Sequence, residues 1–215
     1  MYKRQTFNFT PWLWSTGATS YDINNDNGIK ALTLVKDLVD AGSMSKEVIN
    51  WTQGDVMNQF ISGNIAMMVN GPWQVPTMRE QAPDLNWDVT LLPKDAEYAS
   101  CLGGENFGVI DGDNVDAALD FLQFATSKDE VASYIDDFGY IAARKDVAEG
   151  QFTDDETMQK FTEEMQYAQP RGPHAQWPEI SDALSLAVNE SITGTSTPSD
   201  AAAKAQSTID GILAE

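Results

Sequence analysis

The chain has 215 residues, of which 33 are acidic and 13 are basic, so its formal net charge at pH 7 is −20. This length can bury a hydrophobic core and form one large or two small domains, and the strong negative charge would repel nucleic-acid phosphates, so we expect no nucleic-acid partner. A single cysteine excludes an internal disulfide and a cysteine-rich zinc site, and a single histidine leaves little material for a histidine-dependent triad or metal cluster.

The first segment of the chain is rich in aromatic residues. Residues 7–17 (FNFTPWLWSTG) show no helical period, contain Pro11 and end at Gly17. This pattern predicts an extended segment that leads into a loop. In an extended chain Trp12 and Trp14 would share one face, where either ring could meet a ligand or pack in the core.

Two amphipathic helices are predicted next, over residues 27–41 and 54–62, because apolar side chains recur at the helical step in both. The short apolar run 65–69 that follows predicts a buried strand, which ends at Gly71-Pro72. Pro72 suits the first turn of a new helix, predicted to continue to Gln81. Trp73 would then lie at the carboxyl end of a strand beside free helix N–H groups, where ligands bind in open α/β sheets.

A glycine-rich stretch, residues 102–110 (LGGENFGVI), follows a predicted strand at 87–92. Its glycines permit positive φ angles and a close approach of ligand to backbone, and its end, residues 107–110, predicts another strand. A phosphate-binding loop is the rival interpretation. No Lys-Ser/Thr pair follows and no helix begins there, which disfavours nucleotide binding.

The remainder of the chain is predicted to be mainly helical. Amphipathic patterns predict helices over residues 113–125, 128–137, 154–168, 180–192 and 198–213, with an extended segment at 138–142. Residues 169–180 form a proline-rich loop that carries Arg171 and Trp177. Gly194 is expected to separate the last two helices.

The pattern of Phe60, Gly63, Ala66-Met67 and Asn70-Gly71-Pro72-Trp73 resembles extracellular solute-binding protein family 1, the maltose-binding-protein-like sugar receptors of ABC importers. The resemblance implies an α/β fold of the periplasmic-binding-protein-like type II. It also implies truncation to a helix-rich C-terminal lobe and part of the N-terminal lobe. The implied division is a foreign or artefactual leader (1–5), the first part of the C-terminal lobe (6–103), a returning segment of the N-terminal lobe (104–146) and the helical end of the C-terminal lobe (147–215).

The resemblance also implies a set of ligand-binding residues: Trp12, Trp14, Trp73, Glu105, Asn106, Arg171 and Trp177. In the family, the tryptophan after Gly-Pro stacks on a sugar ring, which gives this role to Trp73. Arg171 could donate paired hydrogen bonds to vicinal hydroxyls, or it could form an ordinary surface ion pair. Glu105 and Asn106 would face the cleft between the lobes, or belong to an ordinary polar loop.

The function implied by the resemblance is binding rather than catalysis. We expect the substrate-binding component of an ABC carbohydrate importer, with a mono- or oligosaccharide ligand, a membrane permease as partner and no cofactor or metal. We also expect an extracytoplasmic location, lipid-anchored or free, and a monomeric full-length protein. No signal peptide or long apolar run is visible, which truncation would explain.

Two alternatives remain open at this stage. A carbohydrate-active enzyme would need two carboxyl groups about 5 to 10 Å apart, with Asp22, Glu105 and Glu179 as the candidates. A structural or partner-binding helical domain would predict that Trp73→Ala changes stability without any effect on sugar affinity.

Overall fold

The computed structural model describes residues 5–214. The expected leader therefore falls almost entirely outside the described residues. The helices predicted from amphipathic periodicity are confirmed, with small differences at their ends. They are α2 (Asp26–Asp40), α3 (Gln53–Ile61), α4 (Val75–Gln81), α5 (Val115–Ala125), α6 (Lys128–Tyr134), α8 (Glu156–Glu164), α9 (Trp177–Thr193) and α10 (Pro198–Leu213). A short helix α7 (Lys145–Ala148) and the 3-10 turns η1 (Lys46–Ile49), η2 (Pro72–Gln74), η3 (Asp136–Phe138) and η4 (Met165–Tyr167) complete the helical elements.

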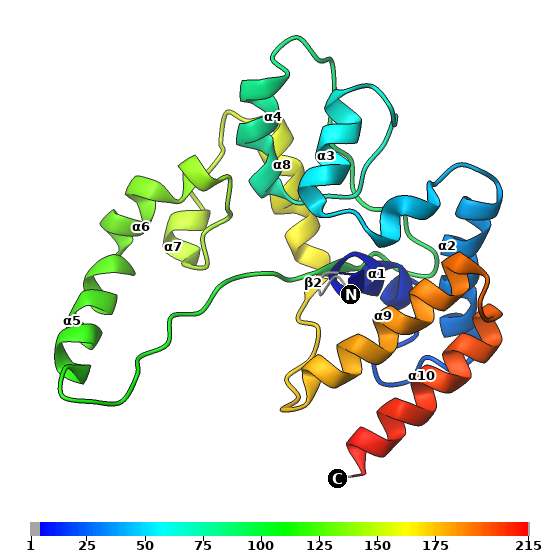
Figure 1. Cartoon of the computed structure of the whole chain (residues 1–215). Coiled ribbons are helices and arrows are strands. Elements are labelled where there is room, and N and C mark those ends of the chain that lie inside the picture. Colours follow the sequence, from blue (N-terminus) through cyan, green and yellow to red (C-terminus); the bar gives the residue numbers. More distant parts are fainter. Residues whose placement is uncertain (1–4, 215) are drawn as a thin grey trace.

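The main core lies between α1 (Gln5–Ser15), α2, α9 and α10, which pack together on one side of the molecule (Figure 1). The apolar positions of these helices recur every three or four residues, so they form one stripe on each helix. The side chains at the centre of the core are fully buried: Leu13, Ile23, Leu32, Ile180, Leu184 and Ile209. Each contributes about 1.5–3 kcal/mol of hydrophobic stabilisation, so this core organises the fold.

The segment predicted to be extended, residues 7–17, is instead largely the helix α1, and that prediction is wrong. Pro11 lies inside the helix and removes one backbone hydrogen bond. Burial compensates for this loss, because Phe9 and Leu13 point into the core and the Thr6 and Ser181 hydroxyls share a buried hydrogen bond of 2.8 Å. Successive residues of a helix are rotated by about 100° around its axis. Trp12 and Trp14 are two positions apart, so they are rotated by about 200° and do not share a face.

A second group of helices contains α3, α4 and α8 (Figure 1). Its buried side chains include Met57, Val75, Met78 and Met158. A reciprocal capping box between Thr52 and Asp55 begins α3, as expected for a Thr and an acidic residue three positions apart.

The helices α5, α6 and α7 form an arm that stands away from the main core at the end of a long stretch after β1 (Figure 1). The arm has a small apolar cluster of its own around Val131, Ala142 and Val147. The arm contacts the segment of η2 and α4 at Gly139, whose φ of 65° lies in the left-handed region. A Cβ at that position would lie 2.7 Å from the Pro72 carbonyl oxygen, so only glycine fits the contact.

The predicted strands are not strands in this structure. Residues 65–69, 87–92 and 107–110 are irregular, and their side chains include the highly exposed Met67 and Ile110. The segment 138–142 is also not a simple extended exit, because it begins in η3 and turns at Gly139. A strand requires a neighbour for its backbone groups, and among the described residues only β1 (Ser100–Cys101) and β2 (Ala168–Gln169) pair in a sheet, in parallel.

Within residues 5–214, no helix is both long enough and apolar enough to cross a membrane.

Candidate functional site

Three aromatic rings and one guanidinium form a continuous row between the main core and the arm. The ring centroids of Tyr140 and Trp73 are 6.3 Å apart, and those of Trp73 and Phe7 are 6.0 Å apart. The guanidinium carbon of Arg171 lies over the Phe7 ring, 5.1 Å from its centroid. We call these four residues the aromatic row. All four side chains are partly exposed, so the row combines flat apolar surfaces with a positive charge at one end.

The local sequence Asn70-Gly71-Pro72-Trp73 determines how the indole is held. Asn70 fixes the turn, because its side-chain amide donates to the Gln53 carbonyl at 2.9 Å and accepts from the Gly71 N–H at 3.0 Å. Pro72 begins η2, where no backbone donor is needed. The indole folds back over Gly71, and a Cβ on Gly71 would lie 2.1 Å from Trp73 Cη2. A glycine is therefore required for this position of the ring.

Phe7 joins Trp73 to Arg171, and the sequence reasoning did not identify it as a site residue. It lies in the first turn of α1, between the fully buried Thr6 and the buried Phe9. Residues 7–17 were predicted to be extended, and in an extended chain Phe7 and Phe9 would lie on the same face. Only the helical geometry of α1 distinguishes the partly exposed Phe7 from the buried Phe9. The Phe7 ring also packs on Gly103, where an added Cβ would be 3.3 Å from the ring.

Arg171 differs from the other arginines that the structure describes. Arg79 and Arg144 are each paired with an aspartate, whereas Arg171 forms no ion pair with any residue in the described range 5–214. Cys101 lies nearby, and burial raises the pKa of its thiol while the charge of Arg171 opposes that rise in part. The thiol is therefore neutral at pH 7 and not an activated nucleophile.

Trp177 belongs to a second aromatic group, formed with Tyr21 and His174. The Trp177 and Tyr21 rings meet edge to face, with their centroids 6.5 Å apart. The ring centroids of Tyr21 and His174 are 6.4 Å apart. Gly172, whose φ is 143°, lies close to the side chains of Tyr21 and Trp177. A Cβ there would be 2.1 Å from the Tyr21 hydroxyl oxygen. Trp177 and Tyr21 thus lie against the residue that follows Arg171 in the chain.

The remaining predicted site residues lie apart from the row. Trp14 is 6% exposed, belongs to the main core and donates from Nε1 to the Ser20 hydroxyl at 3.1 Å. Its ring therefore presents no face to a ligand. Trp12 is partly buried on α1. Glu105 and Asn106 are exposed in the long stretch between β1 and α5 (Figure 1), two and three residues beyond Gly103.

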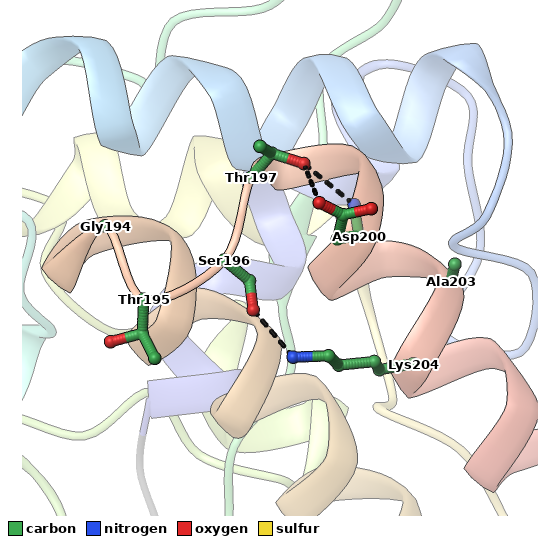
Figure 2. A pocket seen from close by; sticks show the side chains of 7 residues that line it. All are labelled: Gly194, Thr195, Ser196, Thr197, Asp200, Ala203 and Lys204. Carbon is green, nitrogen blue, oxygen red and sulfur yellow. Dashed lines mark hydrogen bonds between the residues drawn. The ribbon is translucent and has the colours of Figure 1, made fainter.

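A surface hollow lies elsewhere, at the junction of α9 and α10 (Figure 2). It is lined by Gly194, Thr195, Ser196, Thr197, Asp200, Ala203 and Lys204. Its polar groups bond to one another: Thr197 caps α10 through Asp200, and Lys204 meets the Ser196 hydroxyl at 2.7 Å. A 17-residue helix separates this hollow from Trp177 by about 25 Å, so we interpret it as a helix junction.

The carboxylates proposed for an enzyme do not gather in one place along the chain. Asp22, Glu105 and Glu179 are all exposed and lie in three separate segments. Across residues 5–214, no group of three or more His, Cys, Asp or Glu side chains could hold a metal ion.

Residues 1–162 match the model of a family described as bacterial extracellular solute-binding proteins. A binding protein of Brucella abortus (strain 2308) is 27% identical over 207 residues, which cover 90% of this chain and 50% of that protein. A binding protein of Brucella suis biovar 1 (strain 1330) gives the same values. The chain therefore spans about half the length of the curated relatives it matches.

Solved structures are similar over nearly the whole chain. An ABC transporter solute-binding protein of Thermotoga lettingae TMO, bound with α-D-tagatose, has 26% identity and a TM-score of 0.83, covering 98% of this chain and 57% of that one. The GacH receptor of Streptomyces glaucescens GLA.O, solved unliganded and with acarbose, has 26% identity and a TM-score of 0.82, with coverage of 96% and 56%. Maltose-bound MalE3 of T. maritima has 23% identity and a TM-score of 0.84, with coverage of 99% and 58%.

Proposed function

The chain belongs to the family of bacterial extracellular solute-binding proteins, and we propose from this premise that it is the substrate-binding part of an ABC carbohydrate importer. The family and the fold class predicted from the sequence are both confirmed, and the chain covers part of the receptor fold. The observation that carries the proposal is the aromatic row of Tyr140, Trp73, Phe7 and Arg171.

The chemistry of the row suits a saccharide. A pyranose has apolar C–H faces and a rim of hydroxyls, so flat aromatic surfaces hold the faces and a few polar groups hold the rim. In the proposed site Trp73 stacks on a sugar ring and Arg171 donates to its hydroxyls. Trp177, Glu105 and Asn106 are proposed as further contacts, and Trp12 as a peripheral one. Trp14 is left out because it is buried.

The aromatic row is proposed to lie in the cleft between the two lobes, because its residues come from different segments of the proposed division. Phe7 and Trp73 fall in segment 6–103, Tyr140 in segment 104–146 and Arg171 in segment 147–215, so the row draws on all three proposed segments. The small separate cluster of the arm supports its assignment to a different lobe. In the complete receptor a ligand that contacts both lobes would favour the closed state, which the membrane permease would recognise.

The proposed setting follows from the family, which is described as extracellular. We propose an extracytoplasmic protein, attached by a lipid anchor or free in the periplasm, that acts as a monomer and delivers a mono- or oligosaccharide to its permease. Three of its structural neighbours are described as bound with tagatose, maltose or acarbose, which makes these three compounds reasonable first ligands to test.

The test is calorimetric titration of the protein, expressed from its complete coding sequence, with maltose, D-tagatose and acarbose. We expect saturable binding of at least one of them without release of reducing sugar, and at least tenfold weaker binding by Trp73→Ala. Trp87→Phe, outside the row, is the matched control and should bind as the wild type does. Turnover of acarbose or maltose would favour the enzyme, and an unchanged affinity of Trp73→Ala would favour a purely structural role.

A further inference from the structure

The structure assigns a positioning role to Phe7. We infer that its ring holds the Arg171 guanidinium available to ligand, so that Arg171 donates paired hydrogen bonds to two adjacent ligand oxygens. This inference deepens the proposed function and depends on it.

The contrast among the arginines is the first step. Arg79 donates two hydrogen bonds to Asp155, at 2.7 and 2.8 Å, and Arg144 donates two to Asp146, at 3.0 and 2.9 Å. In a chain with 33 acidic residues, a partly exposed guanidinium readily finds such a partner. Arg171 instead lies over the Phe7 ring, with no ion pair to residues 5–214. Its hydrogen-bonding edge is therefore not consumed by an aspartate or glutamate of the described chain.

The rigidity of Phe7 is the second step. Thr6 and Thr10, on either side of it in α1, are fully buried, and Thr6 is bonded to Ser181 of α9 at 2.8 Å. Gly103 lies against the ring, since an added Cβ there would be 3.3 Å from it. The backbone that carries Phe7 is thus held by the main core, and an aromatic face attracts a guanidinium that lies over it. Arg171 gains a defined position without the help of a carboxylate.

The chemistry of the ligand is the third step. A guanidinium edge recognises two adjacent oxygens, which can be the vicinal hydroxyls of a neutral sugar or the carboxylate of a uronic acid. The net charge of −20 disfavours the approach of an anion, so we assign the vicinal hydroxyls of a neutral sugar.

The experiment is a double-mutant cycle on the protein expressed from its complete coding sequence. Maltose affinity is measured for Phe7→Leu, Phe7→Tyr, Arg171→Met and Phe7→Leu/Arg171→Met, and galacturonate is the anionic probe. We expect Phe7→Leu to weaken maltose binding about three- to tenfold. Phe7→Tyr should bind as the wild type does, and the double variant no more weakly than Arg171→Met alone. Phe121→Leu, an exposed phenylalanine of α5, is the matched control and should have no effect.

Additive effects of the two substitutions would overturn the inference, as would equal losses in Phe7→Leu and Phe7→Tyr. Binding of galacturonate more tightly than maltose would overturn the assignment of a neutral sugar. If the wild type binds no saccharide, the proposed function fails separately. NMR then tests the contact itself: the side-chain Nε–H resonance of Arg171, identified by its loss in Arg171→Met, should shift downfield in Phe7→Leu as the ring current is lost. An unchanged resonance would overturn the inference.

Discussion

Arg79 and Asp155 tie the helix α4 to the start of α8 by two hydrogen bonds, of 2.7 and 2.8 Å. Asp155 also caps α8, because its side chain accepts from the Met158 N–H at 3.1 Å. The Asp155 carboxylate thus caps the start of α8 and also forms the ion pair between α8 and α4. The hydrogen bonds from Arg79 hold the pKa of Asp155 below its ordinary value of 3.8, although partial burial opposes them.

Asp155→Asn separates the two roles of this carboxylate. Asparagine retains the cap but loses the charge, so we expect a loss of up to about 1 kcal/mol in unfolding free energy at pH 7. Asp155→Ala should lose about 1 kcal/mol more, because the cap is also removed. Since the folded-state pKa is lowered, the ion pair contributes fully above pH 3.8 and is lost as the pH falls through the folded value. Chemical denaturation between pH 3 and 7 should therefore show a flatter pH dependence for Asp155→Asn than for the wild type.

Glu164 should behave in the opposite way. Burial raises the pKa of this carboxyl above its ordinary value of 4.5, and its Oε1 is buried without a hydrogen-bond partner among the described residues. Ionisation of Glu164 in the folded state therefore costs stability, and the cost grows as the pH rises above 4.5. We expect Glu164→Gln to stabilise the fold by up to about 1 kcal/mol at pH 7, with the difference vanishing below pH 4.5. A greater gain at acidic pH than at pH 7 would contradict this account.

Substitution of Trp14 should affect mainly the stability of the fold, and substitution of Trp177 should affect mainly sugar binding. Trp14 is buried and bonded to Ser20, so Trp14→Phe should cost about 1–2 kcal/mol of unfolding free energy and leave sugar affinity unchanged. Trp177→Phe, at a partly exposed position, should instead weaken sugar binding with a smaller change in stability. Thermal melts and calorimetric titrations of both variants test this, and a loss of affinity confined to Trp14→Phe would reverse the assignment.

Gly71→Ala should displace the Trp73 indole, because the new Cβ would lie 2.1 Å from the ring. We expect sugar affinity at least tenfold weaker and a changed tryptophan emission spectrum. Gly211→Ala is the matched control, since it lies in α10 with open space around it and should stabilise the helix by up to about 1 kcal/mol. Normal binding by Gly71→Ala would show that the position of the indole does not matter.

The helix α5 carries large apolar side chains that the described structure leaves exposed. Leu119, Phe121 and Phe124 are 46%, 60% and 58% exposed. Such a surface promotes association, so we expect the 215-residue chain to self-associate in a concentration-dependent way. Phe121→Ser/Phe124→Ser should reduce this association in analytical ultracentrifugation, whereas Leu186→Ser, at an isolated exposed position on α9, should not. A sharp, reversible melt of monomeric wild-type chain would contradict the prediction.

The residues of the aromatic row, which we propose as the binding site, were predicted in part. The turn at Gly71-Pro72 and the loop at residues 169–180 both led to residues of the row, Trp73 and Arg171. Phe7 and Tyr140 were missed, because nothing in their local sequence distinguishes a ring at a surface from a ring in a core. Trp14 was included for the same reason, although its ring is buried.

The sequence by itself determined the amphipathic helices and the family. Helical periodicity is a local property, and caps such as Thr197 and Asn25 mark the helix ends within a few residues. Tertiary structure alone decided the rest. It made residues 5–15 a helix despite Pro11, because burial of Phe9 and Leu13 outweighs the lost hydrogen bond. It left the apolar runs at 65–69 and 107–110 without strand structure, because a strand depends on backbone partners that are distant in sequence. For the same reason, only the folded chain could bring Phe7, Trp73, Tyr140 and Arg171 together.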